Sequence, residues 1–175
     1  MSTLRTIGSG ALEFIASSGA ISDAANVSFT QFNSSIYDHY AFFFQSVIPA
    51  TDNVHLYVRT STDGGSNYDA TNGNYQVGGG NRTGLEVAYY VGSDSNEFGV
   101  GGIFYIYAPH LATYTYADHA NIVYTYGNGT AYSANAAAGN GVVRKVADDV
   151  DAVQILFSSG NIESGEITMF GITNS

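Results

Sequence analysis

The sequence predicts an all-β protein, folded as a two-sheet antiparallel β-sandwich of jelly-roll type with about eight to eleven strands. Three observations lead to this prediction. Apolar residues do not recur at helical spacing over three turns anywhere in the chain. Short alternating or apolar runs recur instead, and Gly, Asn, Asp and Ser separate these runs. Such runs between turn residues are typical of sandwiches and barrels.

The first third of the chain contains four predicted strands. Leu12 to Ala16 is a short apolar run, and Val27 to Phe32 follows an Asp-Ala-Ala turn. Tyr37 to Ile48 is long and rich in aromatic residues, which favour strands. Val54 to Thr60 alternates, with Val and Leu on one face and polar or aromatic residues on the other. This alternation is the pattern of a half-buried strand.

A turn-rich segment separates these strands from the next three. Asp63 to Asn74 reads DGGSNYDATNGN, and its Asp-Gly-Gly start is a hairpin signal that runs on too long for a tight turn. We expect it to project as a surface loop. The short strand Asn74 to Val77 follows it, and Leu85 to Val91 and Ile103 to Ala108 are stronger apolar runs.

Four more strands complete the prediction. Ala120 to Tyr126, Gly141 to Val146, Val153 to Phe157 and Glu166 to Ile172 are each bounded by small or polar residues. The intervening segment Thr130 to Asn140 reads TAYSANAAAGN. Because its residues are small and polar, we expect a long loop there.

The size of the chain indicates one domain. It has 175 residues, 45% of them hydrophobic and 14% aromatic, which is enough for a core. We expect a single β-sandwich domain over residues 1–175, in which residues 1–10 form a short N-terminal docking arm. The chain has no Cys, which excludes disulfides and thiolate metal sites.

Charge excludes several classes of partner. The chain carries 5 basic and 15 acidic residues, for a net charge of -10. A nucleic-acid binder needs Lys and Arg to neutralise phosphates, and attraction to anionic membranes needs them too. No apolar run reaches the length of a membrane span. The start of the chain, MSTLRTIGSGALEF, has no apolar core of a secretory signal, so we expect synthesis in a cytoplasm without a signal peptide.

One candidate metal site lies in the turn-rich segment. Asp63, Asn67 and Asp69 place three oxygen-bearing side chains at spacing i, i+4, i+6, and Ca²⁺ prefers oxygen ligands from such loops. The spacing is not that of an EF-hand. Asp and Asn are also ordinary turn residues, so the alternative is a purely structural role. We expect no bound cofactor and keep these residues as a calcium candidate only.

Catalytic motifs do not emerge from the sequence. It lacks the Gly-x-Ser-x-Gly elbow of hydrolases and the Lys-Ser/Thr ending of a phosphate-binding loop. His39 and His55 lie on neighbouring predicted strands and could meet across a ladder, and His55 shares a strand face with Tyr57. A structural role is the commoner one for such histidines. We therefore expect a protein that is not an enzyme.

Tyrosine pairs are the clearest candidates for a binding surface. Tyr105 and Tyr107 are two residues apart, as are Tyr124 and Tyr126, so each pair lies on one face of its strand. Tyrosine combines an apolar ring with a polar tip, which suits both protein interfaces and sugar platforms. The alternative is that these rings cover a sheet within the domain.

The predicted strand from Tyr37 to Ile48 is apolar on both faces. One face carries Tyr40, Phe42 and Phe44, and the other carries Ala41, Phe43 and Val47. A strand buried on both faces needs either a third layer or a neighbouring subunit. This pattern predicts an oligomer, with Tyr40, Phe42 and Phe44 as interface candidates.

Two segments resemble small β-rich structural proteins of tailed bacteriophages. Val47 to Asp69 reads VIPATDNVHLYVRTSTDGGSNYD, and Ser158 to Ile172 reads SSGNIESGEITMFGI. Both are similar to ordered motifs of that group, as is Tyr37-Asp38 before an apolar strand. The resemblance implies a virion component of jelly-roll type: a capsid decoration or head-fibre protein, or a tail receptor-binding module. It implies no catalytic residues.

The same resemblance implies partners. It predicts self-association, most commonly as a homotrimer, and contact with other virion proteins of the capsid or tail. The alternative function is a carbohydrate-binding module that uses exposed tyrosine rows to hold a host-surface glycan. The two differ in a simple way, because the first requires a defined oligomer and the second requires glycan affinity.

Overall fold

The computed structural model describes residues 12–94, 97–125, 133–138 and 141–173, with only the backbone described for 121–125 and 133–138. All regular structure in these residues is β-strand. The fourteen strands are β1 (Leu12–Ser17), β2 (Ile21–Ala24), β3 (Val27–Phe29), β4 (Tyr37–Pro49), β5 (Val54–Ser61), β6 (Tyr75–Val77), β7 (Gly80–Arg82), β8 (Leu85–Val91), β9 (Val100–Tyr107), β10 (Thr115–Thr125), β11 (Ser133–Ala138), β12 (Val142–Arg144), β13 (Ala152–Phe157) and β14 (Ile162–Thr173). The predicted docking arm, residues 1–10, lies outside the described residues.

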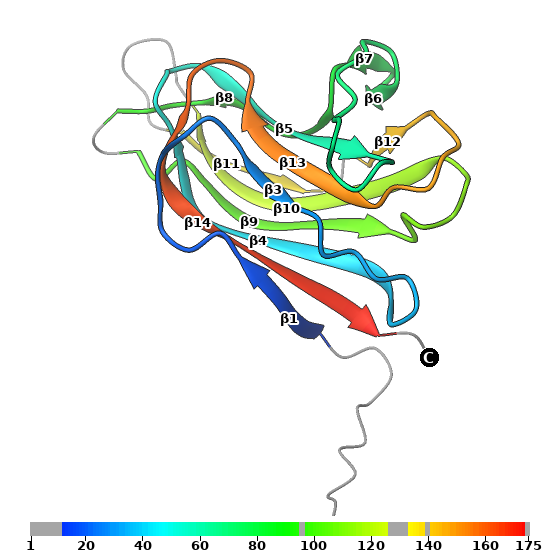
Figure 1. Cartoon of the computed structure of the whole chain (residues 1–175). Coiled ribbons are helices and arrows are strands. Elements are labelled where there is room, and N and C mark those ends of the chain that lie inside the picture. Colours follow the sequence, from blue (N-terminus) through cyan, green and yellow to red (C-terminus); the bar gives the residue numbers. More distant parts are fainter. Residues whose placement is uncertain (1–11, 95–96, 126–132, 139–140, 174–175) are drawn as a thin grey trace, which may run out of the picture.

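The main strands form two layers that face one another (Figure 1). Hydrogen bonds connect them in the order β1-β14-β4-β9-β10-β8-β5-β13-β3, and the neighbours along this path are antiparallel. The first layer comprises β1, β14, β4, β9 and β10, and the second comprises β8, β5, β13 and β3. Only Thr125 and Val91 pair where the path turns from β10 into β8. The predicted antiparallel β-sandwich is therefore confirmed.

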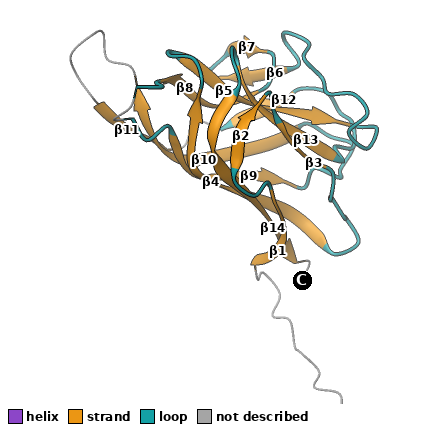
Figure 2. Ribbon diagram, turned by 60° about the vertical axis from the view of Figure 1, so that its left-hand side comes forward, coloured by secondary structure: helices purple, strands orange, loops and turns teal. Residues whose placement is uncertain are grey.

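Short strands extend this framework at its margins. β12 pairs with the first residues of β10 and with β6, and β6 forms a hairpin with β7. This hairpin rises above the second layer in both views of the chain (Figure 2). β2 pairs with the start of β14. Among the described residues, no helix is long and apolar enough to cross a membrane.

Each strand predicted from the sequence has a counterpart in the structure. Three short strands, β2, β7 and β11, were not predicted. They raise the number of strands to fourteen, above the eight to eleven that the sequence predicts. The expectation of a long loop over Thr130 to Asn140 is wrong, because Ser133–Ala138 forms β11 and pairs with Ala120–Thr125 of β10. Small polar residues favour strands little by themselves, and here the free edge of β10 supplies the backbone partners.

The core lies between the two layers. Phe42 of β4 contacts Phe29 of β3 across the sandwich, with ring centroids 5.5 Å apart, and Phe104 of β9 within its own layer, at 6.1 Å. The core side chains with no exposed surface include Phe42, Leu56, Val58, Leu85, Phe104, Ile106, Ile155, Ile162, Ile167 and Met169.

A bulge in β4 changes which side chains enter this core. Ser46 has a φ of 47°, and the register of β4 against β9 shifts between Phe44 and Val47. The extra residue turns Val47 into the core, where it is fully buried. The sequence prediction that Val47 shares a face with Ala41 and Phe43 is therefore wrong.

Candidate functional site

The outer surface of the first layer is built from three rows of side chains. Directly paired residues of antiparallel strands point to the same face, so the strand register defines each row. Each row contains one residue from β1, β14, β4, β9 and β10, in that order. The rows are Leu12, Ile172, His39, Tyr107 and Tyr116; Phe14, Phe170, Ala41, Tyr105 and Asp118; and Ser17, Thr168, Phe43, Ile103 and Ala120. We call this surface the outer aromatic face.

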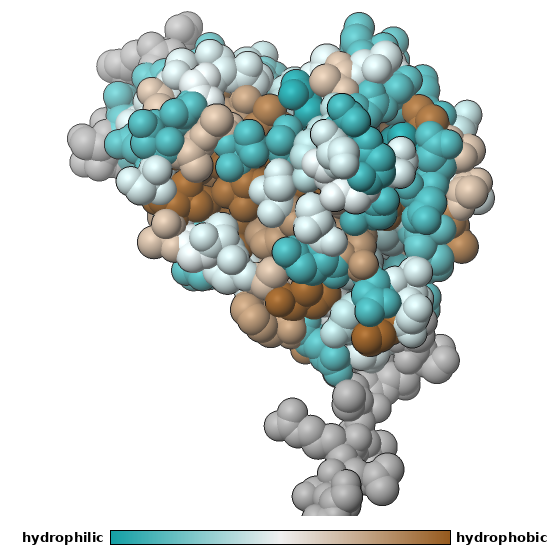
Figure 3. Space-filling view, in the orientation of Figure 1, coloured by the Kyte–Doolittle hydropathy of each residue, from teal (hydrophilic) through white to brown (hydrophobic). Residues whose placement is uncertain are grey.

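Rings on the outer aromatic face contact one another, and some of them are exposed while others are half-buried. Tyr105 and Tyr107 stack with centroids 6.3 Å apart and planes 12° apart, and Phe170 packs 4.9 Å from Phe43. Phe14 is 64% exposed and Tyr116 is 60% exposed. Figure 3 views the sandwich edge-on and shows apolar residues in a band between its two layers and in smaller groups lower on the molecule. On the outer aromatic face itself, the exposed apolar side chains are Leu12, Phe14, Tyr107 and Tyr116.

Charge is sparse on the outer aromatic face. Asp118 is the one acidic residue in its three rows, although the chain has a net charge of -10. Burial and the nearby Asp118 carboxylate raise the pKa of Tyr107. His39 Nδ1 accepts a hydrogen bond from the Ala108 N–H at 2.9 Å, so a neutral His39 carries its proton on Nε2. At the margin of the rows, the Glu166 carboxylate accepts a hydrogen bond from the Ser17 hydroxyl at 2.7 Å, so the face carries Asp118 within its rows and Glu166 at its edge.

The structure divides the sequence-predicted aromatic residues into separate groups. Tyr105 and Tyr107 lie on the outer aromatic face. Tyr40, Phe42 and Phe44 are 1%, 0% and 3% exposed, so they belong to the core of a single chain and cannot contact a second one. The prediction of an interface there is wrong, because β4 turns these three rings inward and presents Phe43 outward. The Tyr124 side chain and all of Tyr126 lie outside the described residues.

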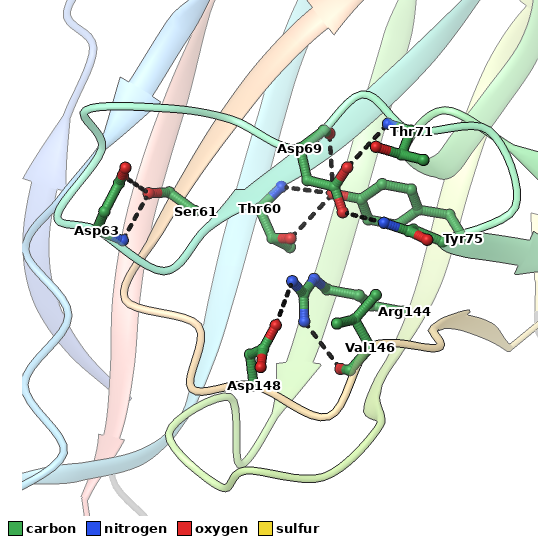
Figure 4. A network of polar contacts seen from close by, with 10 residues as sticks. Thr60, Ser61, Asp63, Asp69, Thr71, Tyr75, Arg144, Val146 and Asp148 are labelled. Carbon is green, nitrogen blue, oxygen red and sulfur yellow. Dashed lines mark hydrogen bonds and ion pairs between the residues drawn. The ribbon is translucent and has the colours of Figure 1, made fainter.

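The candidate calcium residues serve as turn caps (Figure 4). The Asp63 carboxylate accepts hydrogen bonds from the Asn67 side chain at 2.7 Å, the Asn67 N–H at 2.8 Å and the Ser61 hydroxyl at 2.7 Å. These donors lower the pKa of Asp63 to about 2. The Asp69 carboxylate turns instead to the Thr71 N–H and the Asn74 amide. Asp63 and Asn67 are thus brought together, and Asp69 faces other partners.

A buried hydroxyl anchors the loop that carries these carboxylates. Tyr75 is fully buried, and its hydroxyl accepts from the Thr60 N–H at 3.1 Å and donates to the Asp69 carbonyl at 3.0 Å. Arg144, 3% exposed, donates to the Val146 carbonyl at 2.8 Å. Among the described residues, no three His, Cys, Asp or Glu side chains are placed to share a metal ion. The arrangement holds a surface loop in place, as the sequence predicted for Asp63 to Asn74.

A second surface cluster lies on the outer side of the second layer. It consists of His55 and Tyr57 of β5, Glu86, Tyr89 and Tyr90 of β8, and Arg82 of β7, and we call it the tyrosine–histidine cluster. Tyr57 and Glu86 are register partners. Glu86 is buried and ion-paired with Arg82, and its other oxygen lies 3.6 Å from His55 Nδ1. Burial and the Glu86 charge raise the pKa of Tyr57.

Sequence reasoning placed His55 and Tyr57 on one strand face but did not find this cluster. His55 and Glu86 are distant in the sequence, and only the pairing of β5 with β8 brings them together. The expectation that His39 and His55 could meet across a ladder is wrong. β4 pairs with β14 and β9, whereas β5 pairs with β8 and β13.

A small cavity of about 70 Å³ opens at one end of the sandwich. Its lining consists of Phe32, Ser34, Tyr40, Pro109, His110, Asp149, Val150 and Asp151. Two buried atoms of this lining, His110 Nδ1 and Asp151 Oδ1, have no hydrogen-bond partner within the described part of the chain. The space suits ordered water, which commonly satisfies such groups.

No family model, curated protein or solved structure matches the chain.

Proposed function

We propose that the chain is a non-enzymatic structural component of a bacteriophage virion that assembles with copies of itself, as a homotrimer, through the outer aromatic face. Its place would be that of a capsid decoration or head-fibre protein, or of a tail-associated module. The observation that carries the self-assembly is the row of rings across β1, β14, β4, β9 and β10: Phe14, Tyr107 and Tyr116 are exposed, and Phe170, Phe43 and Tyr105 between them are half-buried.

Exposed rings in this arrangement favour association. Soluble monomers rarely expose large contiguous apolar patches, and aromatic residues are enriched where protein surfaces meet. Phe14, Tyr107 and Tyr116 together leave much of their ring area in water. Removing that area from water on contact with a second chain is favourable by about 25 cal/mol per Å².

Charge supports the same surface. Copies of a chain with a net charge of -10 repel one another over most orientations. The rows of the outer aromatic face contain a single acid, Asp118, so contact through them places few like charges together.

The virion assignment is supported by the two segments that resemble phage structural proteins. Val47 to Asp69 spans the end of β4, β5 and the following loop, and Ser158 to Ile172 covers β14 almost completely. β14 contributes Phe170 and Ile172 to the outer aromatic face. The resembling C-terminal segment therefore supplies part of the surface to which we assign assembly.

The test is the solution mass of the purified protein by light scattering. We expect a mass of three 18.5 kDa chains for the unmodified protein. The double variant Tyr107→Ser, Tyr116→Ser should shift the mass toward one chain. The control Tyr89→Ser, Leu111→Ser removes two similarly exposed side chains elsewhere and should leave the mass unchanged. A single-chain mass for the unmodified protein, or equal behaviour of both variants, would overturn assembly through this face.

A second candidate function is carbohydrate binding by the tyrosine rows of the same face. The near-parallel rings of Tyr105 and Tyr107 favour it, because a sugar ring can lie against such a platform. It predicts a single-chain mass together with glycan affinity that Tyr105→Ala removes. A stable trimer without glycan affinity would exclude it.

A further inference from the structure

We propose that the tyrosine–histidine cluster is a binding site for one neutral pyranose ring of a glycan. The cluster lies on the second layer, away from the rows of the outer aromatic face. The proposal therefore stands or fails independently of self-assembly, which the light-scattering mass reports separately.

The exposed rings of the cluster form a platform with a wall. Tyr89 and Tyr90 are 44% and 50% exposed, with centroids 5.3 Å apart and planes 82° apart. The His55 ring lies 5.6 Å from Tyr90 and stacks on Tyr57, with planes 11° apart. The C–H face of a pyranose is apolar and flat, so one ring can support it while the perpendicular ring limits where it lies.

Polar groups beside the rings can recognise hydroxyls. His55 Nδ1 is buried and directed toward Glu86, while 30% of the His55 side chain is exposed. A neutral imidazole that donates from Nδ1 toward Glu86 has Nε2 as its hydrogen-bond acceptor. The Arg82 side chain is 33% exposed and supplies guanidinium donors next to the carboxylate that holds it. Sites for small ligands typically combine aromatic rings with a small number of polar groups that point toward the ligand.

Charge decides which sugars fit. Glu86 neutralises Arg82 within the cluster, while Arg59, which lies close enough to Tyr57 to affect its pKa, donates to the Thr83 carbonyl. The chain as a whole, at -10, repels anions. A neutral hexose thus fits better than an acidic sugar such as a sialic acid.

The backbone of Tyr90 accounts for the exposure of two consecutive tyrosines. Its φ is 56°, in the left-handed region that bulky residues adopt rarely. The register of β8 against β5 shifts between Val54 and Leu56, so β8 carries a bulge here. The bulge leaves Tyr89 and Tyr90 exposed next to each other on the cluster.

The experiment is saturation-transfer NMR with methyl β-D-galactopyranoside, methyl α-D-glucopyranoside and N-acetylneuraminic acid at millimolar concentration. We expect transfer to at least one neutral glycoside and weaker transfer to the acid. Tyr90→Asn should weaken binding by about tenfold, and Tyr90→Phe should retain it. The Asn variant should melt no lower than the unmodified protein, because relief of backbone strain accompanies the loss of the ring.

Tyr114→Ala is the matched control, since Tyr114 is also 50% exposed but is not part of the cluster, and it should bind as the unmodified protein does. Absence of transfer to both neutral glycosides would overturn the proposal. So would equal transfer in the Tyr90→Asn variant, or transfer that Tyr105→Ala removes and Tyr90→Asn does not, because the sugar would then lie on the other layer.

Discussion

Gly99 approaches Val47 so closely that a β-carbon on the glycine would overlap the Val47 carbonyl oxygen. On the other side of the same strand, a β-carbon on Gly165 would lie 2.6 Å from the Ser46 carbonyl oxygen. Both glycines have positive φ, and Ser46 between them does as well. The bulge that turns Val47 into the core is therefore enclosed by two positions that exclude a side chain.

Replacing Gly99 by Ala should lower the free energy of unfolding by more than backbone strain alone explains. Gly64 has nearly the same φ, 71° against 69°, and a β-carbon there would meet nothing within 4 Å. Gly64→Ala therefore measures the strain alone, about 1 kcal/mol. We expect Gly99→Ala to lose a further 1–3 kcal/mol or so in urea denaturation, because backbone atoms must move. Equal losses in the two variants would contradict the close approach.

The Tyr75 hydroxyl should contribute measurably to stability. It accepts from the Thr60 N–H and donates to the Asp69 carbonyl, all within a buried region. Tyr75→Phe leaves these groups without their partner, which costs about 1–3 kcal/mol. Tyr116→Phe removes a hydroxyl from a side chain that is 60% exposed and should change stability by less than about 0.5 kcal/mol. Similar unfolding midpoints for both variants would disprove a role of the buried hydroxyl.

Acid should weaken the loop that follows β5. Hydrogen bonds from Asn67 and Ser61 lower the pKa of Asp63 from its usual 3.8 to about 2. A carboxyl with a lowered folded-state pKa stabilises the protein fully above 3.8, and this stabilisation is lost as the pH falls through about 2. A carboxyl-carbon NMR titration should place Asp63 well below its usual range and show a higher pKa in Asn67→Ala. An unchanged titration in that variant would rule out the proposed cause.

Removal of calcium should leave the fold unchanged. Donors from the protein already occupy the Asp63 carboxylate, and the Asp69 carboxylate faces Thr71 and Asn74. We expect the melting temperature in EDTA and in millimolar Ca²⁺ to agree within about 1 °C. A rise with Ca²⁺ that Asp63→Ala abolishes would restore the calcium site.

Local sequence patterns predicted the strands well where alternation or aromatic content was strong, as in Val54 to Thr60. They failed at β11, where Ser, Asn and Ala form a strand because β10 offers a free edge. They also failed at Val47, because a bulge changes the parity of a strand without any apolar residue marking it. Both failures arise from contacts between strands that are not encoded in one segment.

The candidate site was predictable only in part. Tyr105 and Tyr107 are two residues apart in the sequence, which predicted that they lie on one face of their strand. The register of β9 confirms that placement. The same reasoning could not tell which face of the Tyr37 to Ile48 strand was inside, since both were apolar. The tyrosine–histidine cluster depends on the pairing of β5 with β8, which a single sequence does not reveal.

Phe42 and Phe43 are neighbours on β4 with opposite roles, and they separate stability from assembly. Phe42 is fully buried between the layers, so Phe42→Ala should reduce the free energy of unfolding by about 3–5 kcal/mol. Phe43 packs on Phe170 at the outer aromatic face, so Phe43→Ala should cost only about 1–2 kcal/mol. Urea denaturation measures both losses under conditions that keep the chains dissociated. Light scattering should then show weaker association for Phe43→Ala alone, because only this ring is available to a second chain. If Phe43→Ala destabilises the single chain as much as Phe42→Ala does and leaves association intact, the outer ring is part of the core and the face does not mediate assembly.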